Sequence, residues 1–180
     1  MTSIVRETRE TRVEIRLAPG AGTTRCRTGL RFLDHMMTTL AATAGLEMEL
    51  TARGDLRHHV IEDVALATGE AVARLLPERP VRYGERTLAM DDALVQVALD
   101  LGGRAYYRGP LPAPLYDHWM RSFATQARAT LHVRVLRGRD RHHVIEAAFK
   151  ALGFALRDAL ASSGAGASTK GAVRWEDGAC

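Results

Sequence analysis

The chain has 180 residues, of which 46% are hydrophobic and 26% are charged, and its formal net charge is +4. This composition is typical of a soluble globular protein, and no apolar run approaches the roughly 20 residues that cross a bilayer, so we expect no membrane association. Basic residues are scattered among acidic ones instead of forming a block with aromatic residues, so we expect an anionic small ligand and no nucleic acid.

The N-terminal segment and the cysteines indicate the compartment. Charges occur from Arg6 onward, without the apolar stretch that a secretory signal needs. The two cysteines, Cys26 and Cys180, have no CxxC spacing, so neither a zinc knuckle nor a redox pair is indicated. We therefore expect a cytoplasmic protein with reduced thiols.

Hydrophobic periodicity predicts strands and helices along the chain. Alternation typical of strands occurs at residues 11–17, 24–30, 46–52, 93–101, 104–107 and 131–136. Helical spacing follows each of two His–His pairs, at 61–75 and 145–159, and the first of these helices should end before Pro77. Asp34 and Asp117 each stand where an N-cap would open a shorter helix. Residues 110–116 form a proline-rich connector.

The chain also contains an internal repeat. RHHVIE occurs at residues 57–62 and again at 141–146, and DHMMTTLA at 34–41 resembles DHWMRSFA at 117–124. The repeat predicts two half-repeats, residues 1–85 and 86–163, followed by a flexible tail at 164–180. We expect an α+β fold of duplicated half-domains, each a small sheet with helices on one face, packed together through those helices.

Six of the seven histidines fall in the repeat, together with two glutamates, which suggests metal binding. His58 and Glu62 are four residues apart on one helix and share a face, whereas the adjacent His59 points about 100° away and would serve a second metal. Six imidazoles and two carboxylates divide evenly into two sites of three His and one Glu. Nitrogen and oxygen ligands without thiolate suit Mn, Fe, Co, Ni or Zn. The candidate metal ligands are His35, His58, His59, Glu62, His118, His142, His143 and Glu146.

Taken in order, these motifs resemble those of the imidazoleglycerol-phosphate dehydratase family of histidine biosynthesis. The segments that carry the resemblance are RETRET (6–11), TGLRFLDHM (28–36), HHVIED (58–63), VRYG (81–84), MDDALVQVALDLGGR (90–104), HHVIEAAFKAL (142–152) and STKG (168–171). The resemblance implies a fold like the second domain of ribosomal protein S5. It also implies two divalent metal ions, Mn²⁺, per active site, and an assembly of 24 chains with sites completed between subunits.

The resemblance further implies an activity and a role for each matching residue. The reaction would dehydrate imidazole glycerol phosphate to imidazole acetol phosphate, with the substrate's ring held as an imidazolate between the two metals. The eight residues named above would be the metal ligands, and Glu10 would be the catalytic acid or base. The phosphate-binding residues would be Arg82, Arg104, Lys150, Ser168 and Lys170.

The chain departs from the family's pattern near the first His–His pair. GDLR at Gly54–Arg57 leads directly into that pair, where the family often has a longer run with paired acids. Val60 stands where a threonine is common, and Thr39 where a glutamine is common. None of these changes touches a proposed metal ligand.

Two other functions would use the same ligands. A dimetal hydrolase would activate water with them, although no aspartate is among the ligands and the phosphate-binding set would have no purpose. A non-catalytic metal-binding assembly would take up metal without turnover and would give no reason for Arg82, Arg104 and Lys170.

Overall fold

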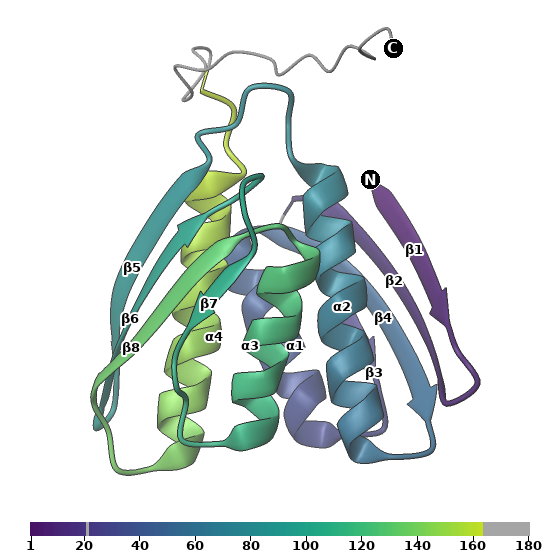
Figure 1. Cartoon of the computed structure of the whole chain (residues 1–180), viewed down its shortest axis with the longest axis horizontal. Coiled ribbons are helices and arrows are strands. Elements are labelled where there is room, and N and C mark those ends of the chain that lie inside the picture. Colours follow the sequence, from purple (N-terminus) through teal and green to yellow (C-terminus); the bar gives the residue numbers. More distant parts are fainter. Residues whose placement is uncertain (21, 164–180) are drawn as a thin grey trace, which may run out of the picture.

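The computed structural model describes residues 1–20 and 22–163, which form two four-stranded sheets with helices between them (Figure 1). The first sheet has the order β1-β2-β4-β3, and the second has the order β5-β6-β8-β7. The strands of the first sheet are β1 (Thr2–Glu7), β2 (Thr11–Pro19), β3 (Thr24–Arg27) and β4 (Leu46–Gly54). Those of the second are β5 (Tyr83–Met90), β6 (Ala93–Asp100), β7 (Tyr106–Arg108) and β8 (Thr130–Arg137).

The two sheets have the same topology. In each, the first three strands of the order pair antiparallel and the last strand pairs parallel, β3 with β4 and β7 with β8. An identical order with identical strand directions confirms the predicted α+β fold of duplicated half-domains.

Four helices fill the space between the sheets (Figure 1). They are α1 (Arg31–Ala44), α2 (Arg57–Leu75), α3 (Pro114–Gln126) and α4 (Arg141–Ala159). The halves meet through these helices, since α1 packs on α4 and α2 packs on α3. Within the helical layer, Trp119 of α3 and Phe149 of α4, both from the second half, are fully buried with ring centroids 4.6 Å apart. The core therefore lies between the sheets. None of the described helices is long and apolar enough to cross a membrane.

Two glycines allow the helices of the two halves to approach closely. A Cβ atom at Gly69 of α2 would lie 2.8 Å from the backbone oxygen of Phe123 in α3. A Cβ atom at Gly153 of α4 would lie 2.7 Å from the backbone oxygen of Leu40 in α1. Both contacts are too short for a side chain, and the two glycines are 84 positions apart, as are the RHHVIE copies. The repeat thus preserves a close packing contact as well as the histidines.

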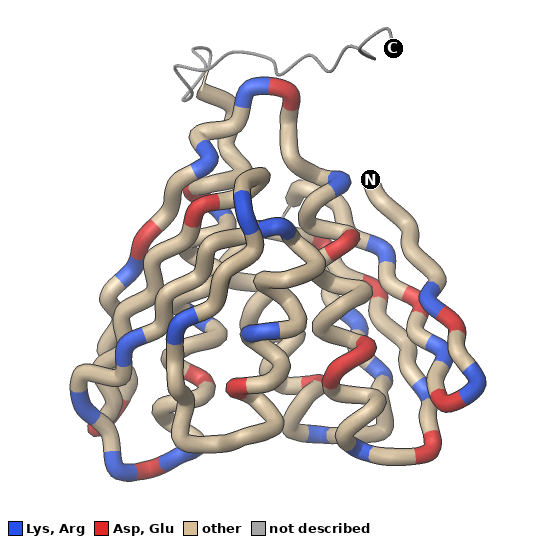
Figure 2. Tube along the Cα trace, viewed as in Figure 1, with Lys and Arg blue, Asp and Glu red and all other residues tan. Residues whose placement is uncertain are grey.

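The outer faces of the sheets are charged. Figure 2 shows basic and acidic residues interspersed over both sheets. On the first sheet Arg12 forms ion pairs with Glu7 at 2.6 Å and with Glu14 at 2.8 Å. Exposed pairs of this kind add little stability, but they keep the surface free of a large patch of one sign.

Some details of the secondary structure differ from the predictions. Strands β1 and β5 were not predicted, because β1 is short and charged and β5 alternates between exposed and half-buried positions without a buried apolar face. The N-cap predictions for Asp34 and Asp117 are wrong. Both residues lie inside the first helical turn, since α1 begins at Arg31 and α3 begins at Pro114, within the predicted connector.

The two aspartates instead fix the segments that precede their helices. Asp34 Oδ1 accepts hydrogen bonds from the backbone nitrogen and the hydroxyl of Thr28, both at 2.8 Å. Asp117 Oδ1 accepts from the backbone nitrogen of Leu111 at 2.8 Å and from the hydroxyl of Tyr107 at 2.6 Å. Asp34 and Asp117 directly precede His35 and His118, so these bonds tie the start of each helix, next to its histidine, to the chain that leads into it.

Candidate metal centre

The histidines of the repeat gather at one end of the helical layer, where α2 and α4 begin (Figure 1). The first cluster joins His35 of α1 to His142 and Glu146 of α4. Glu146 Oε2 lies 3.2 Å from His35 Nε2 and 3.1 Å from His142 Nε2. The second cluster joins His118 of α3 to the first turns of α2.

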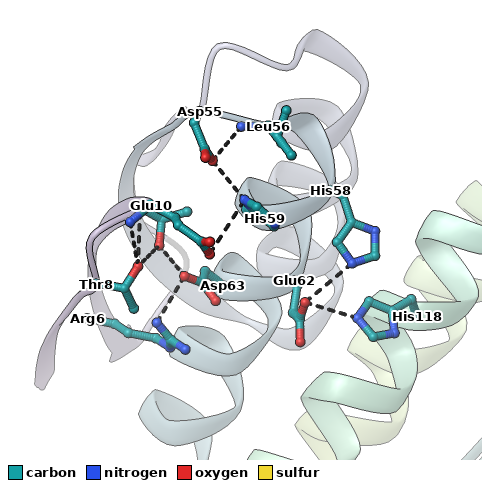
Figure 3. A network of polar contacts seen from close by, with 11 residues as sticks. Arg6, Thr8, Glu10, Asp55, Leu56, His58, His59, Glu62, Asp63 and His118 are labelled. Carbon is teal, nitrogen blue, oxygen red and sulfur yellow. Dashed lines mark hydrogen bonds and ion pairs between the residues drawn. The ribbon is translucent and has the colours of Figure 1, made fainter.

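Glu62 occupies the centre of this second cluster (Figure 3). Its Oε2 atom lies 3.4 Å from His58 Nε2 and 3.3 Å from His118 Nε2. The rings of His58 and His118 stack with their centroids 5.0 Å apart. The second cluster thus has the same two-histidine, one-glutamate composition as the first.

Each cluster combines residues of both halves. The HxxxE pair of one half meets the histidine of the other half's DH motif, because α1 packs on α4 and α2 packs on α3. His35 therefore lies with His142, 107 positions away, and not with His58 of its own half. Either half alone would supply only part of each cluster.

The donor sets fit a divalent ion. Two ligands that are each about 2.1 Å from one ion lie about 3.0 Å apart at a right angle and about 3.4 Å apart at a tetrahedral angle. The measured nitrogen-to-oxygen separations of 3.1–3.4 Å fall in that interval. Moreover, His118 Nε2 is buried and makes no hydrogen bond within the described residues, although Glu62 is close. A buried imidazole nitrogen of this kind is suited to a metal.

The glutamates of the two clusters differ in burial. The Glu146 side chain is 9% exposed and receives Lys150 Nζ at 3.0 Å on Oε1, whereas Glu62 is 35% exposed. Burial opposes ionisation of Glu146, but hydrogen bonds from Lys150 and His35 outweigh it and lower the pKa of this carboxyl group. Glu146 is thus held as the carboxylate that a metal ligand must be.

The second histidine of each His–His pair lies outside these clusters. His59 Nδ1 lies 2.7 Å from Asp55 Oδ1 (Figure 3), and His143 Nδ1 lies 2.7 Å from Asp92 Oδ1. The hydrogen bond to the carboxylate raises the pKa of each imidazole. Backbone N–H groups, that of Arg139 first, together with His143 lower the pKa of Asp92 to about 2.

Glu10 lies on the turn between β1 and β2, beside His59 (Figure 3). Its Oε2 atom is 3.6 Å from His59 Nδ1, and its side chain is 60% exposed. Thr8 shapes the turn by accepting hydrogen bonds from the backbone nitrogens of Glu10 at 3.1 Å and Thr11 at 3.0 Å. The buried Asp63 of α2 accepts from the Thr11 hydroxyl and so ties the turn to the helix that carries His59.

The predicted phosphate-binding residues that the structure describes, Arg82, Arg104 and Lys150, do not form one cluster. Lys150 lies beside Glu146, but Arg82 lies at the opposite end of α4, where its backbone nitrogen donates to the Ala159 oxygen at 2.9 Å. Thirteen residues of helix separate Ala159 from Glu146, which is about 20 Å at 1.5 Å per residue. Ser168 and Lys170 lie outside the described residues.

Arg82 and Arg104 share that opposite end. The backbone oxygen of Arg82 accepts from Leu101 at 2.9 Å, which brings the segment carrying Arg104 alongside. The Arg82 guanidinium forms two hydrogen bonds with Asp100, at 2.5 Å and 3.1 Å, while the Arg104 side chain is exposed.

Sequence reasoning missed three carboxylates around this centre. A local signal marked Asp55, because it stands just before a helix whose first turn contains two histidines. Asp63 also carried one, as an aspartate on the buried face of α2. No local signal marked Asp92, since the pairing of β6 with β8, which places Leu94 opposite Arg137, brings its turn to residues 139–143.

Comparison with known proteins identifies a single family. The family profile for imidazoleglycerol-phosphate dehydratase matches residues 28–156. The imidazoleglycerol-phosphate dehydratase of Pyrobaculum calidifontis is 45% identical over 185 residues, covering 94% of this chain and 98% of the relative. That of Desulfitobacterium hafniense is 42% identical over 190 residues, covering 94% and 96%.

Solved structures agree with the sequence matches. A crystal structure of IGPD from Pyrococcus furiosus in complex with (S)-C348 superposes with a TM-score of 0.87 at 37% identity, covering 94% of this chain and all of the other. The imidazoleglycerol-phosphate dehydratase structure from Staphylococcus aureus superposes with a TM-score of 0.79 at 29% identity, covering 89% and 98%.

Proposed function

Because the chain belongs to the imidazoleglycerol-phosphate dehydratase family and is therefore a hydro-lyase of histidine biosynthesis, we propose that it acts with two divalent metal ions. Its reaction would remove water from imidazole glycerol phosphate to give imidazole acetol phosphate. The observation that carries the metal dependence is the pair of matching clusters, His35–His142–Glu146 and His58–His118–Glu62, in one chain.

The two clusters suit the symmetry of the substrate's ring. An imidazole ring has two nitrogen atoms, and divalent ions held by the clusters would supply Lewis acidity to them and so lower the pKa of the ring. Ligands of nitrogen and oxygen without thiolate suit Mn, Fe, Co, Ni or Zn, and we choose Mn²⁺ among these on the resemblance to the family. We place the enzyme in the cytoplasm. The duplicated fold supplies the two nearly equal donor sets.

Acid–base chemistry would fall to Glu10. It is an exposed carboxylate beside His59, and the hydrogen bonds of Thr8 and Thr11 hold its turn against α2. We assign it to proton transfer at the substrate carbon whose C–H bond breaks. Glu10→Gln should abolish turnover and leave the metal content unchanged. Undiminished turnover at full metal content would refute the assignment.

The active site would be shared between chains. The Arg82 backbone contacts Ala159, which lies about 20 Å along α4 from Glu146, and His59 and His143 lie outside both clusters. A site that needs three histidines per metal and a phosphate clamp must then draw residues from neighbouring subunits. We propose that such sites form in a homo-oligomer of 24 chains.

Subunit mixing tests this shared site. Glu62→Gln removes a proposed metal ligand at one end of the helical layer, and Arg82→Ala removes a proposed phosphate-binding guanidinium group at the other. Glu62→Gln alone should be inactive, and Arg82→Ala alone should have little activity at substrate concentrations near the KM of the parent chain, because its own KM is raised. Co-assembled variants should regain activity, because some sites would draw the intact Glu62 and the intact Arg82 from different chains. Activity that does not return would contradict a site built from several chains.

One assay separates the three candidate functions. Protein loaded with Mn²⁺ is incubated with imidazole glycerol phosphate, and formation of the ketone is followed before and after treatment with a chelator. Ketone formed only by the metal-loaded protein supports the dehydratase. Release of inorganic phosphate would support a dimetal hydrolase, and metal uptake without any product would support a binding assembly.

A further inference from the structure

A carboxylate holds the second histidine of each His–His pair in the same way. Asp55 Oδ1 accepts from the Leu56 backbone nitrogen at 2.7 Å and lies 2.7 Å from His59 Nδ1. The Asp92 carboxylate accepts from the Arg139 backbone nitrogen at 2.6 Å, and its Oδ1 atom lies 2.7 Å from His143 Nδ1. In both halves, one carboxylate binds the backbone before the helix and the Nδ1 atom of the imidazole.

The two carboxylates come from different places in the sequence. Asp55 stands between β4 and α2, two residues before the helix begins at Arg57, whereas Asp92 stands in the turn between β5 and β6, 51 positions from His143. Asp140, which precedes α4, is used otherwise, because it accepts from the His142 backbone nitrogen as the N-cap. The two halves therefore place a carboxylate at Nδ1 from different positions in the sequence, which indicates that this contact is itself needed.

That requirement follows from imidazole chemistry. A neutral imidazole carries one N–H group, and a carboxylate at Nδ1 fixes the proton there and leaves Nε2 as the lone-pair nitrogen. Histidines that bind metals very commonly donate their other N–H group to such a carboxylate, which orients the ring and strengthens its donor nitrogen.

We propose that Asp55 and Asp92 are positioning residues that hold His59 and His143 with Nε2 ready to bind a metal. This inference rests on the proposed function, in which these two histidines complete the metal sites. It also assigns a role to the segment at Gly54–Arg57, which lacks the paired acids common before the first His–His pair in the family: in this chain Asp55 supplies the carboxylate.

Substitution by asparagine tests the proposal, because asparagine keeps the size and can still accept the backbone N–H. At Asp92 one oxygen, Oδ2, accepts the backbone N–H and the other, Oδ1, faces the ring, so the amide NH₂ group would face Nδ1, donate to it, and favour the tautomer with hydrogen on Nε2, which cannot bind a metal. At Asp55 a single oxygen, Oδ1, makes both contacts, so asparagine would replace the charged oxygen at Nδ1 with a neutral amide group and weaken the donor nitrogen of the ring. We expect Asp55→Asn and Asp92→Asn each to lower the affinity for one of the two Mn²⁺ ions bound per chain by about 10–100-fold. Competition with a fluorescent chelator measures both the affinity and the number of ions.

Asp140→Asn is the matched control, since it removes the same charge close to His143 without touching the ring. It should leave both affinities unchanged. Equal affinities in the parent chain, Asp55→Asn and Asp92→Asn would overturn the proposal, and so would an equal weakening in Asp140→Asn. A parent chain that binds fewer than two ions would instead contradict the proposed function, before any variant is compared.

Glu10→Gln excludes a competing arrangement. Glu10, Asp55 and His59 lie close enough together to bind an ion directly through His59 Nδ1. In that case Glu10→Gln would weaken the same ion as Asp55→Asn does. Unchanged metal affinity in Glu10→Gln supports Asp55 as the partner of Nδ1, and a loss that matches Asp55→Asn overturns it.

Discussion

Replacing Gly153 with alanine should disturb the packing of α1 on α4 and, through it, the first metal cluster. The added Cβ atom would overlap the Thr43 hydroxyl and would lie 2.7 Å from the Leu40 backbone oxygen. The hydroxyl can rotate away, but the backbone oxygen cannot. Because ordinary contact begins at 3.4 Å, α1 would have to retreat by about 0.7 Å, the difference between the two distances.

The energetic consequence combines two opposing effects. Overpacking costs about 1–3 kcal/mol, and we expect a cost near the top of this range because the obstructing atom, the Leu40 oxygen, belongs to the backbone. Alanine gains about 1 kcal/mol over glycine in a helix. The net loss should be about 2 kcal/mol, which lowers the melting temperature of a chain of this size by about 4–8 °C. Thermal unfolding in the presence of a chelator measures this loss without the contribution of bound metal.

The same displacement should reach the metal site. His35 lies on α1 and its cluster partners lie on α4, so a shift of α1 separates Nε2 of His35 from Glu146. Metal affinity at this cluster should fall, while the Glu62 cluster, on α2 and α3, keeps its affinity. The double variant Gly153→Ala/Thr43→Ala should recover only part of the stability, because Leu40 still obstructs. A melting temperature equal to that of the parent in Gly153→Ala alone would refute this reasoning.

Three further outcomes follow from individual contacts. Gly69→Ala should lower metal affinity at the Glu62 cluster and leave that of the Glu146 cluster unchanged, because Gly69 contacts α3 and not α1. A metal titration in which only the Glu146 cluster loses affinity would contradict this expectation. Arg82→Ala should raise the KM for the phosphorylated substrate at least tenfold without lowering metal content, and an unchanged KM would remove Arg82 from the phosphate site. Thr11→Val removes a hydroxyl that bonds the buried Asp63 and should lower the free energy of unfolding by about 1–3 kcal/mol in denaturant titration, whereas a neutral effect would show that Arg6 alone satisfies that carboxylate.

The sequence predicted the duplication and most of the buried elements, because identical hexapeptides and helical stripes are local signals. It did not predict β5, whose residues are stabilised by pairing with β6 and by α4 and not by a local apolar pattern. It also placed the helix starts too late at Asp34 and Asp117. An aspartate before a helical pattern resembles an N-cap, and only the structure shows that these two bind the preceding chain.

The candidate site also depends on contacts between residues that are distant in the sequence. The eight proposed metal ligands could be selected from the sequence because the DH and HHxxE motifs that contain them each occur twice. Their grouping could not, since spacing along the chain leaves open which histidines share an ion, whereas packing brings His35 to His142. Asp92 was missed for a related reason. Its partner is 51 residues away, and nothing in either segment alone indicates the contact.

The exchange of histidines between the halves explains why the duplicated chain forms a single unit. Each HxxxE pair depends on a histidine of the other half, and Gly69 and Gly153 set the distance between the helices that bring them together. A half-domain on its own would expose the buried faces of its two helices and leave each glutamate with a single histidine from its own helix. Stability and the proposed metal binding would therefore impose the same constraint on the α1–α4 and α2–α3 interfaces. A substitution there that preserves the apolar core but changes the helix separation should impair metal binding before it unfolds the protein.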